Sequence, residues 1–217
     1  MEYRNPNTWN DRWAIEHVFK EKRDGFFVEA GALNGKNSSS TYLLEKNYNW
    51  KGILVEPSPE MFEALCVNRP KSKCFDCCLY DTNKEIDFIN FSENLGWSGI
   101  EENWRENRDV HPKKDKHQVL KKQALTLECL LDKAEAPTII DYLALDAEGS
   151  EFKILKNFNF EKYKFKAISS ESYTNQAASV KKILQENDYI QVGNPFSEVY
   201  HEGYFIHQDY IEINYKL

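Results

Sequence analysis

The chain has 217 residues, 41% of them hydrophobic and 29% charged, which is the balance of a folded domain rather than of a disordered chain. A formal net charge of −7 argues against a protein that binds the phosphate backbone of nucleic acids, because such binding depends on clustered Lys and Arg. No apolar run approaches the roughly 20 residues that span a bilayer, and the first residues lack the apolar segment of a secretory signal. We therefore expect a cytoplasmic protein without nucleic-acid or membrane partners.

Short apolar runs that favour β-structure alternate along the chain with segments of helical periodicity. This alternation is typical of a mostly parallel sheet with helices on both faces. The predicted strands are residues 26–29, 53–56, 73–78, 139–145 and 166–169, followed by 204–206 and 210–213 as a C-terminal antiparallel hairpin. Helices are predicted from Pro59, after Gly149 and over 175–187. The length fits one domain over residues 1–217, with residues 1–23 as a helical extension.

Residues 90–118 form the least regular stretch, rich in Asn, Glu, Arg, Trp and His. Loops this long inside a compact domain usually serve a function or are disordered. We interpret the stretch as a loop or lid inserted on the substrate side of the domain. His111 and His117 lie in it and could act as a general base, although the sequence favours ordinary surface histidines.

A glycine-containing turn follows the first predicted strand, which ends in an acidic residue. Gly31 lets the backbone turn sharply and lets a ligand approach closely, while Ala32 occupies the middle of the turn. The spacing ExGxxxG, from Glu29 through Gly31 to Gly35, differs from the GxGxxG of dinucleotide sites and favours a ligand without a pyrophosphate. Ser40 and Thr41 follow as candidate caps of a helix whose N–H groups would face that ligand.

The next two strands also end in candidate ligand-binding residues. Glu56, followed by Pro57, stands where a doubly wound fold places an acidic residue against ribose hydroxyls, and its alternative is a surface carboxylate. The end of the third strand, Cys78 and Leu79, is expected beside an adenine ring. Asp81 could accept a hydrogen bond from the adenine amine or could cap a turn.

Acidic residues also follow the long buried strand 139–145 and the strand after it. Asp146, Glu148 and Glu171 would meet at the carboxyl edge of the sheet, where ligands of open α/β folds bind. The alternative for Asp146 and Glu148 is a favourable interaction with a helix N-terminus. Their oxygen atoms are also of the kind that Mg²⁺ accepts, so these three are the candidate ligands if a metal is used.

Three segments together resemble the FkbM-type methyltransferase family. They are residues 25–35 (GFFVEAGALNG), 50–57 (WKGILVEP) and 145–151 (LDAEGSE), and the resemblance covers residues 24–173. It implies a Rossmann-like class I methyltransferase fold, S-adenosylmethionine as methyl donor, and O-methylation of a hydroxyl on a sugar or another small-molecule or glycan acceptor.

The resemblance also implies roles for residues that match the family motifs. Glu29, Gly31 and Gly35 would hold the methionine part of the donor, Glu56 the ribose, and Asp146 with Glu148 the junction of donor and acceptor. Family members often have Ser-Asn-Thr before the first helix, where this chain has residues 39–41 as Ser-Ser-Thr. The predicted cofactor contacts are Glu29, Gly31, Ala32, Gly35, Ser40, Thr41, Glu56, Pro57, Cys78, Leu79, Asp81 and Asp146.

Methylation of an alcohol requires removal of its proton, which a carboxylate or a divalent ion such as Mg²⁺ can assist. Asp146, Glu148 and Glu171 are accordingly the predicted catalytic residues. Two alternatives remain from the sequence: a nucleotide-dependent oxidoreductase of the NAD type, and a noncatalytic S-adenosylmethionine-binding protein.

Overall fold

The computed structural model describes residues 2–106, 116–171, 174–199 and 201–213. A seven-stranded sheet runs through its centre in the order β10-β11-β9-β8-β1-β2-β3. The pairs β1–β2, β2–β3, β1–β8 and β8–β9 are parallel, and β11 is antiparallel to both of its neighbours. The strands are β1 (Phe26–Ala30), β2 (Lys51–Val55), β3 (Lys73–Phe75), β8 (Ile139–Leu145), β9 (Lys164–Glu171), β10 (Tyr189–Val192) and β11 (Glu202–His207).

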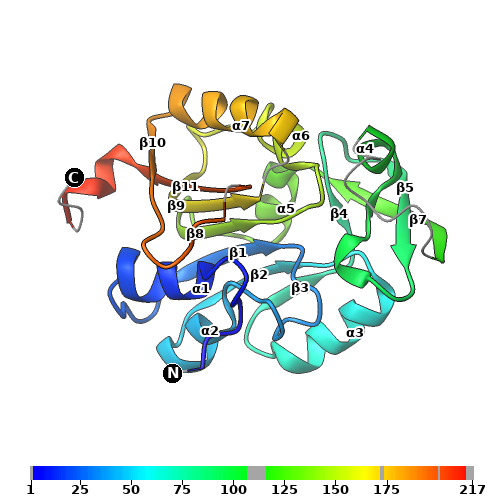
Figure 1. Cartoon of the computed structure of the whole chain (residues 1–217), viewed down its shortest axis with the longest axis horizontal. Helices are drawn as coiled ribbons and strands as arrows, with labels where there is room; N and C mark the ends of the chain where they lie inside the picture. The colour runs from blue at the N-terminus through cyan, green and yellow to red at the C-terminus, as the bar shows by residue number, and fades with distance from the viewer. Residues whose placement is uncertain (1, 107–115, 172–173, 200, 214–217) are drawn as a thin grey trace.

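Helices cover both faces of this sheet (Figure 1). One face carries α1 (Asn10–Arg12), the π-helix η1 (Trp13–Val18), α2 (Tyr42–Tyr48) and α3 (Pro59–Asn68). The other carries α5 (Leu127–Lys133), α6 (Glu151–Leu155) and α7 (Thr174–Glu186). This confirms the expected mostly parallel α/β fold with helices on both faces. No helix in the described part of the chain is both long and apolar enough to cross a membrane.

Each strand contributes side chains to the apolar cores on both faces of the sheet, because successive side chains point to opposite faces. In β1, Phe27 packs into the core under α2 and α3, whereas Val28 packs into the core under α5 and α6. Glu29, two residues after Phe27, therefore faces α2 and α3. This alternation decides what its carboxylate can reach.

A smaller sheet with the order β4-β7-β5-β6 stands at the carboxyl end of the large one. It consists of β4 (Cys78–Leu79), β5 (Glu85–Phe91), β6 (Gly99–Ile100) and β7 (His117–Leu125), with the 3-10 turn η2 (Leu95–Trp97) and α4 (Glu101–Glu106) in its connections. Much of the stretch 90–118 is thus regular structure, where the sequence predicted an irregular loop. Its residues 107–115, including His111, lie outside the described residues.

Two strand predictions are corrected by the structure. Residues 73–78 are not one strand, because β3 ends at Phe75 and β4 joins the smaller sheet. The C-terminal antiparallel hairpin exists, but β11 pairs with β10 rather than with residues 210–213. Those residues belong to a 3-10 helix, η3 (Gln208–Ile213). Alternation of apolar residues is weak in β10, whose Ile190 is 41% exposed, which explains why the sequence did not reveal it.

Candidate cofactor and acceptor site

A pocket lies at the carboxyl ends of β1, β2, β4 and β8. Seven of the predicted site residues line it: Gly31, Glu56, Pro57, Cys78, Leu79, Asp146 and Glu148. Its remaining lining residues are Ala30, Leu33, Val55, Cys77, Phe88, Leu95, Gly96, Ser98, Gly99, Ile100, Ala147 and Ser150. The pocket therefore combines three carboxylates, at or just after the ends of β2 and β8, with a wall that is mostly apolar.

Gly31 keeps the ends of β1 and β8 close together. Its φ is +74°, and a Cβ built on it would stand 1.9 Å from the carbonyl oxygen of Asp146. The backbone N–H of Gly31 donates to Val55 O at 3.1 Å, and Asp146 N donates to Ala30 O. Any larger residue at position 31 would have to separate these strand ends, so the glycine is a requirement of the pocket floor.

Glu56 is 3% exposed, and each of its carboxylate oxygens accepts one backbone hydrogen bond. Leu33 N donates to Oε2 and Ser58 N donates to Oε1, both at 2.8 Å. Burial raises the pKa of this carboxyl to about 7, although the two N–H donors oppose the shift. A carboxylate offers about four acceptor positions, so Glu56 retains capacity for the hydroxyl groups of a ribose.

The small sheet supplies one wall of the pocket, which the sequence analysis did not identify. Leu95, Gly96, Ser98, Gly99 and Ile100 all lie in or beside η2 and β6. A Cβ on Gly99 would approach the Cβ of Glu148 to 3.1 Å, so this wall touches the loop after β8. The two closely spaced glycines were the signal available in the sequence, since they allow one backbone to approach another.

One side of the site is acidic. One carboxylate oxygen from each of Asp146, Glu148 and Glu171 lies within 4.8 Å of the others. Glu171, at the end of β9, lies outside the lining of the pocket but within this cluster. The cluster unites the three residues predicted to be catalytic.

Crowding of like charges raises the pKa of these carboxyls. Enclosure by protein, and then the charge of Glu171, raises the pKa of Asp146 well above its usual range. Burial, and then the charge of Glu148, raises the pKa of Glu171 to about 8. Asp146 is exposed as a residue and lines the pocket, so water reaches part of it and weakens both effects. Asp146 and Glu171 share a hydrogen bond, which needs a proton on one of the two.

Glu151 supports the loop that carries this cluster. It is 1% exposed, and its Oε1 accepts hydrogen bonds from Ala147 N at 2.7 Å and Gly149 N at 3.4 Å. Its Oε2 is buried without a hydrogen-bond partner among the described residues. Burial raises the pKa of Glu151 from 4.5 to about 7.

We expect Glu151→Gln to stabilise the protein at pH 8.5. The raised pKa means that the folded state binds this proton more tightly than the unfolded chain does. The free energy of unfolding therefore falls as pH rises from about 4.5 to about 7, and the loss is complete above that range. Glutamine keeps the acceptor for Ala147 N without the buried charge. Thermal unfolding should show a Tm several degrees above the wild type at pH 8.5 and a smaller difference at pH 5; an equal difference at both would contradict this.

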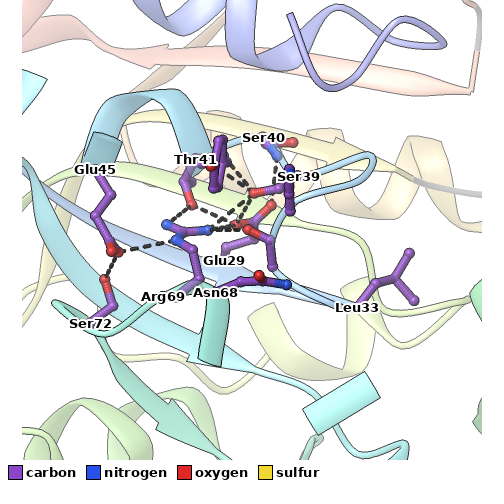
Figure 2. Close-up of polar contacts among 12 residues, drawn as sticks. Glu29, Leu33, Ser39, Ser40, Thr41, Glu45, Asn68, Arg69 and Ser72 are labelled. Atoms are coloured by element: carbon purple, nitrogen blue, oxygen red, sulfur yellow. Dashed lines mark hydrogen bonds and ion pairs between the residues drawn. The ribbon is translucent and has the colours of Figure 1, made fainter. Parts of the chain in front are cut away.

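Six predicted cofactor contacts lie outside the pocket lining, and five of them lie in or after β1: Glu29, Ala32, Gly35, Ser40 and Thr41. Glu29 is 3% exposed and accepts hydrogen bonds from Ser40 N at 2.6 Å, Ser39 Oγ at 2.9 Å and Thr41 Oγ1 at 2.5 Å. Figure 2 shows this carboxylate enclosed by the residues that follow the turn. The structure thus directs Glu29 toward α2 and α3, and Ala32 into the core on that face.

Asp81 also lies away from this pocket. Its Oδ2 accepts from Lys156 Nζ at 2.6 Å, and the residue lines a separate depression beside α5 and α6. His117, in β7, packs against Phe91 and Trp104 with ring centroids 5.5 and 6.1 Å away. His117 lines a second groove together with Phe91 and Leu95. Of these three residues, only Leu95 also lines the pocket at the strand ends.

No curated protein sequence matches the chain. Similar solved structures include a TehB-like SAM-dependent methyltransferase from Corynebacterium glutamicum (8% identity, 93% of this chain and 88% of that chain, TM-score 0.45). Others are TrmK of M. capricolum in complex with S-adenosyl-homocysteine (10%, 92% and 66%, 0.44) and a human methyltransferase 10 domain containing protein (11%, 91% and 77%, 0.44).

The sequence comparison is more direct than these distant structural likenesses. Residues 29–190 match the family described as the methyltransferase FkbM domain. The match extends over well more than half of the chain and contains the three pocket carboxylates, Glu56, Asp146 and Glu148, as well as Glu171. The chain therefore belongs to the FkbM methyltransferase domain family and is an S-adenosylmethionine-dependent methyltransferase.

Proposed function

We propose that this enzyme methylates a hydroxyl oxygen of a small-molecule or glycan acceptor. The observation that supports the proposal is the cluster of Asp146, Glu148 and Glu171, whose oxygens lie within 4.8 Å of one another beside the cofactor pocket. A hydroxyl is a poor nucleophile until its proton is removed, and a carboxylate within hydrogen-bond reach can remove it. The cluster offers three carboxylates from which such a base could come.

The pocket fits the methyl donor. The absence of a Cβ on Gly31 leaves room between β1 and β8, Glu56 can accept from ribose hydroxyls, and Leu79 and Ile100 offer apolar surface for a flat base. When bound, S-adenosylmethionine supplies an electrophilic methyl group on its sulfonium. The residues of the chain then have two tasks, which are to orient the acceptor and to take its proton.

The hydrogen-bonded pair of Asp146 and Glu171 is the proposed general base. In the pair, one carboxyl carries a proton and the other is charged, and the charged oxygen can accept the hydroxyl proton. Raised pKa values near the working pH suit such a role, because the base must both take and release a proton. The negative charge of Glu148 raises the pKa of Glu171.

The decisive test is transfer of a labelled methyl group to candidate acceptors. We expect label in alcohols of sugars or glycans and not in matched amines, RNA or DNA, with S-adenosylhomocysteine formed in equal amount. Label on nitrogen, or on nucleic acid, would contradict the proposed acceptor. Absence of label from every fraction of a cell extract, with intact cofactor binding, would instead favour the noncatalytic alternative. Copurification of a nicotinamide nucleotide would favour the oxidoreductase alternative.

The same three carboxylates are the predicted Mg²⁺ ligands, so the metal needs its own test. Under the base mechanism proposed here, turnover should persist in EDTA and should not rise when Mg²⁺ is added. Loss of turnover in EDTA that Mg²⁺ restores would assign the cluster to metal binding, and the acceptor proton would then be lost from a metal-bound hydroxyl.

Replacement of Glu148 by Gln should move the pH dependence of kcat to lower pH. Activity of the wild type should rise with pH through a midpoint near the Glu171 pKa of about 8. Removal of the Glu148 charge favours the ionised form of Glu171, so its pKa falls and the midpoint falls with it. The control is Glu135→Gln, whose side chain is 89% exposed, and it should keep the wild-type midpoint. A midpoint that stays or rises in Glu148→Gln would contradict the charge interaction.

A further inference from the structure

Arg69 is fully enclosed, with 1% of its surface exposed, at the C-terminal end of α3. All of its guanidinium nitrogens donate hydrogen bonds, as Figure 2 shows. Nε donates to Glu45 Oε2 at 3.1 Å, and Nη2 donates to Thr41 Oγ1 at 2.9 Å. Nη1 donates to Gly35 O at 3.1 Å, to Ser39 Oγ at 3.2 Å and to Glu29 Oε2 at 3.5 Å.

These contacts join three elements that are far apart in the sequence. Glu29 belongs to β1, Glu45 to α2, and Arg69 follows α3. A buried ion pair of this kind often contributes little to stability, because removing the charges from water costs about as much as their attraction returns. We therefore consider what the network fixes in space rather than its energy. It fixes the position of the turn between Gly31 and Thr41.

The turn is held from two sides. On the pocket side, Glu56 accepts from Leu33 N. On the opposite side, Arg69 donates to Gly35 O, and the neighbouring Asn68 Nδ2 donates to Asn34 O at 2.8 Å. Gly35 has a φ of +72°, and a Cβ there would lie 2.7 Å from Arg69 Cγ, so the turn and the arginine are in close contact.

We infer that Arg69 is a positioning residue for the cofactor turn. It fixes Glu29, Ser39, Thr41 and Gly35 as one unit, and that unit sets where Gly31 and Leu33 stand in the pocket wall. Arg69 reaches the cofactor only through these residues. Its removal should therefore weaken cofactor binding, and it should leave the acidic cluster at the end of β8 and β9 unaffected.

Arg69→Lys is the most informative variant. Lysine keeps the positive charge between Glu29 and Glu45, but one ammonium cannot also reach the positions of both Nη atoms and Nε. We expect the Kd of S-adenosylhomocysteine, measured by calorimetry on the folded enzyme, to rise about tenfold or more. The KM for S-adenosylmethionine should rise with it, while kcat at saturating cofactor should change less than threefold. Hydrogen exchange should quicken at residues 33–41 and not in β8.

The matched control is Arg23→Lys. Arg23 also donates to a main-chain carbonyl, Asn47 O at 3.0 Å, but from the exposed surface. Its variant should bind S-adenosylhomocysteine as the wild type does. A lower Tm in Arg69→Lys with a Kd within twofold of wild type would overturn the inference, because Arg69 would then serve stability alone.

Glu45→Gln tests the same inference if Arg69→Lys does not fold. The amide keeps an oxygen for Ser72 Oγ and Arg69 Nε but removes the charge that orients the guanidinium. We expect a Kd about threefold higher, with faster exchange at residues 33–41. An unchanged Kd and unchanged exchange in folded Glu45→Gln would overturn the role of the network in positioning the turn.

Discussion

Asp146→Asn should lower kcat by about a hundredfold or more, the range in which a general base contributes to proton transfer. Asparagine has nearly the same shape as aspartate but cannot take a proton at the pH of the assay. The side chain is exposed to the pocket and its oxygen lies within 4.8 Å of oxygens of Glu148 and Glu171. Asp146 both lines the pocket and shares a hydrogen bond with Glu171.

The measurement is single-turnover transfer to the best acceptor, together with the Kd of S-adenosylhomocysteine. We expect the rate to fall while the Kd stays within about threefold of wild type, since the amide still fills the same space. Asp81→Asn is the control, because Asp81 pairs with Lys156 Nζ outside the pocket. Its turnover and its cofactor affinity should both stay within twofold. Turnover of Asp146→Asn close to wild type would remove Asp146 from the chemistry.

The strand-end residues could be predicted because parallel strands bring their carboxyl ends to one edge. From this rule alone, Glu56, Asp146 and Glu171 could be assigned to a common crevice although they are far apart in the sequence. The structure brings Asp146 and Glu171 into contact and sets Glu56 in the same pocket as Asp146. The location of these residues follows from the ends of their strands, and the roles assigned to them stay predictions.

For Glu29, the strand-end rule does not predict the direction of the side chain. It also lies near the end of a parallel strand, but it precedes the last residue of β1 and shares a face with Phe27. Its side chain therefore points under the sheet edge, toward Arg69, rather than into the pocket. The sequence contained the needed signal in the alternation of β1. The partner, Arg69, could not be predicted because nothing in the local pattern at the end of α3 distinguishes a buried arginine from an exposed one.

The pocket wall built by the small sheet was missed for a different reason. Residues 95–100 have short elements of two or three residues, too short for a hydrophobic period to emerge. Their position depends on β5 pairing with β7 across an intervening stretch of the chain. Such a pairing is a long-range property that composition does not reveal, whereas the glycines at 96 and 99 gave only a local indication of close approach.

Gly31→Ala should be the most damaging single-methyl change in the pocket. The new Cβ would lie 1.9 Å from Asp146 O, a backbone atom that cannot rotate away. The φ of +74° adds a cost of about 1–2 kcal/mol for a residue with a Cβ. Relief of the contact must separate β1 from β8 at the point where Asp146 N donates to Ala30 O. We expect a Tm lower by about 10 °C or more, since about 1 kcal/mol shifts the Tm of a domain this size by about 2–4 °C.

The cofactor affinity should fall further than the loss of stability explains. Leu33 and Asp146 line the pocket just after β1 and β8, so they would move with the displaced strand ends. At a temperature where the variant is folded, the Kd of S-adenosylhomocysteine should rise about a hundredfold, which corresponds to about 2.7 kcal/mol. Gly96→Ala is the matched control: Gly96 lines the same pocket, but a Cβ there meets no atom within 4 Å. It should bind the cofactor within about threefold of wild type. Equal effects of the two substitutions would mean that added bulk in the pocket, and not the distance between β1 and β8, limits binding.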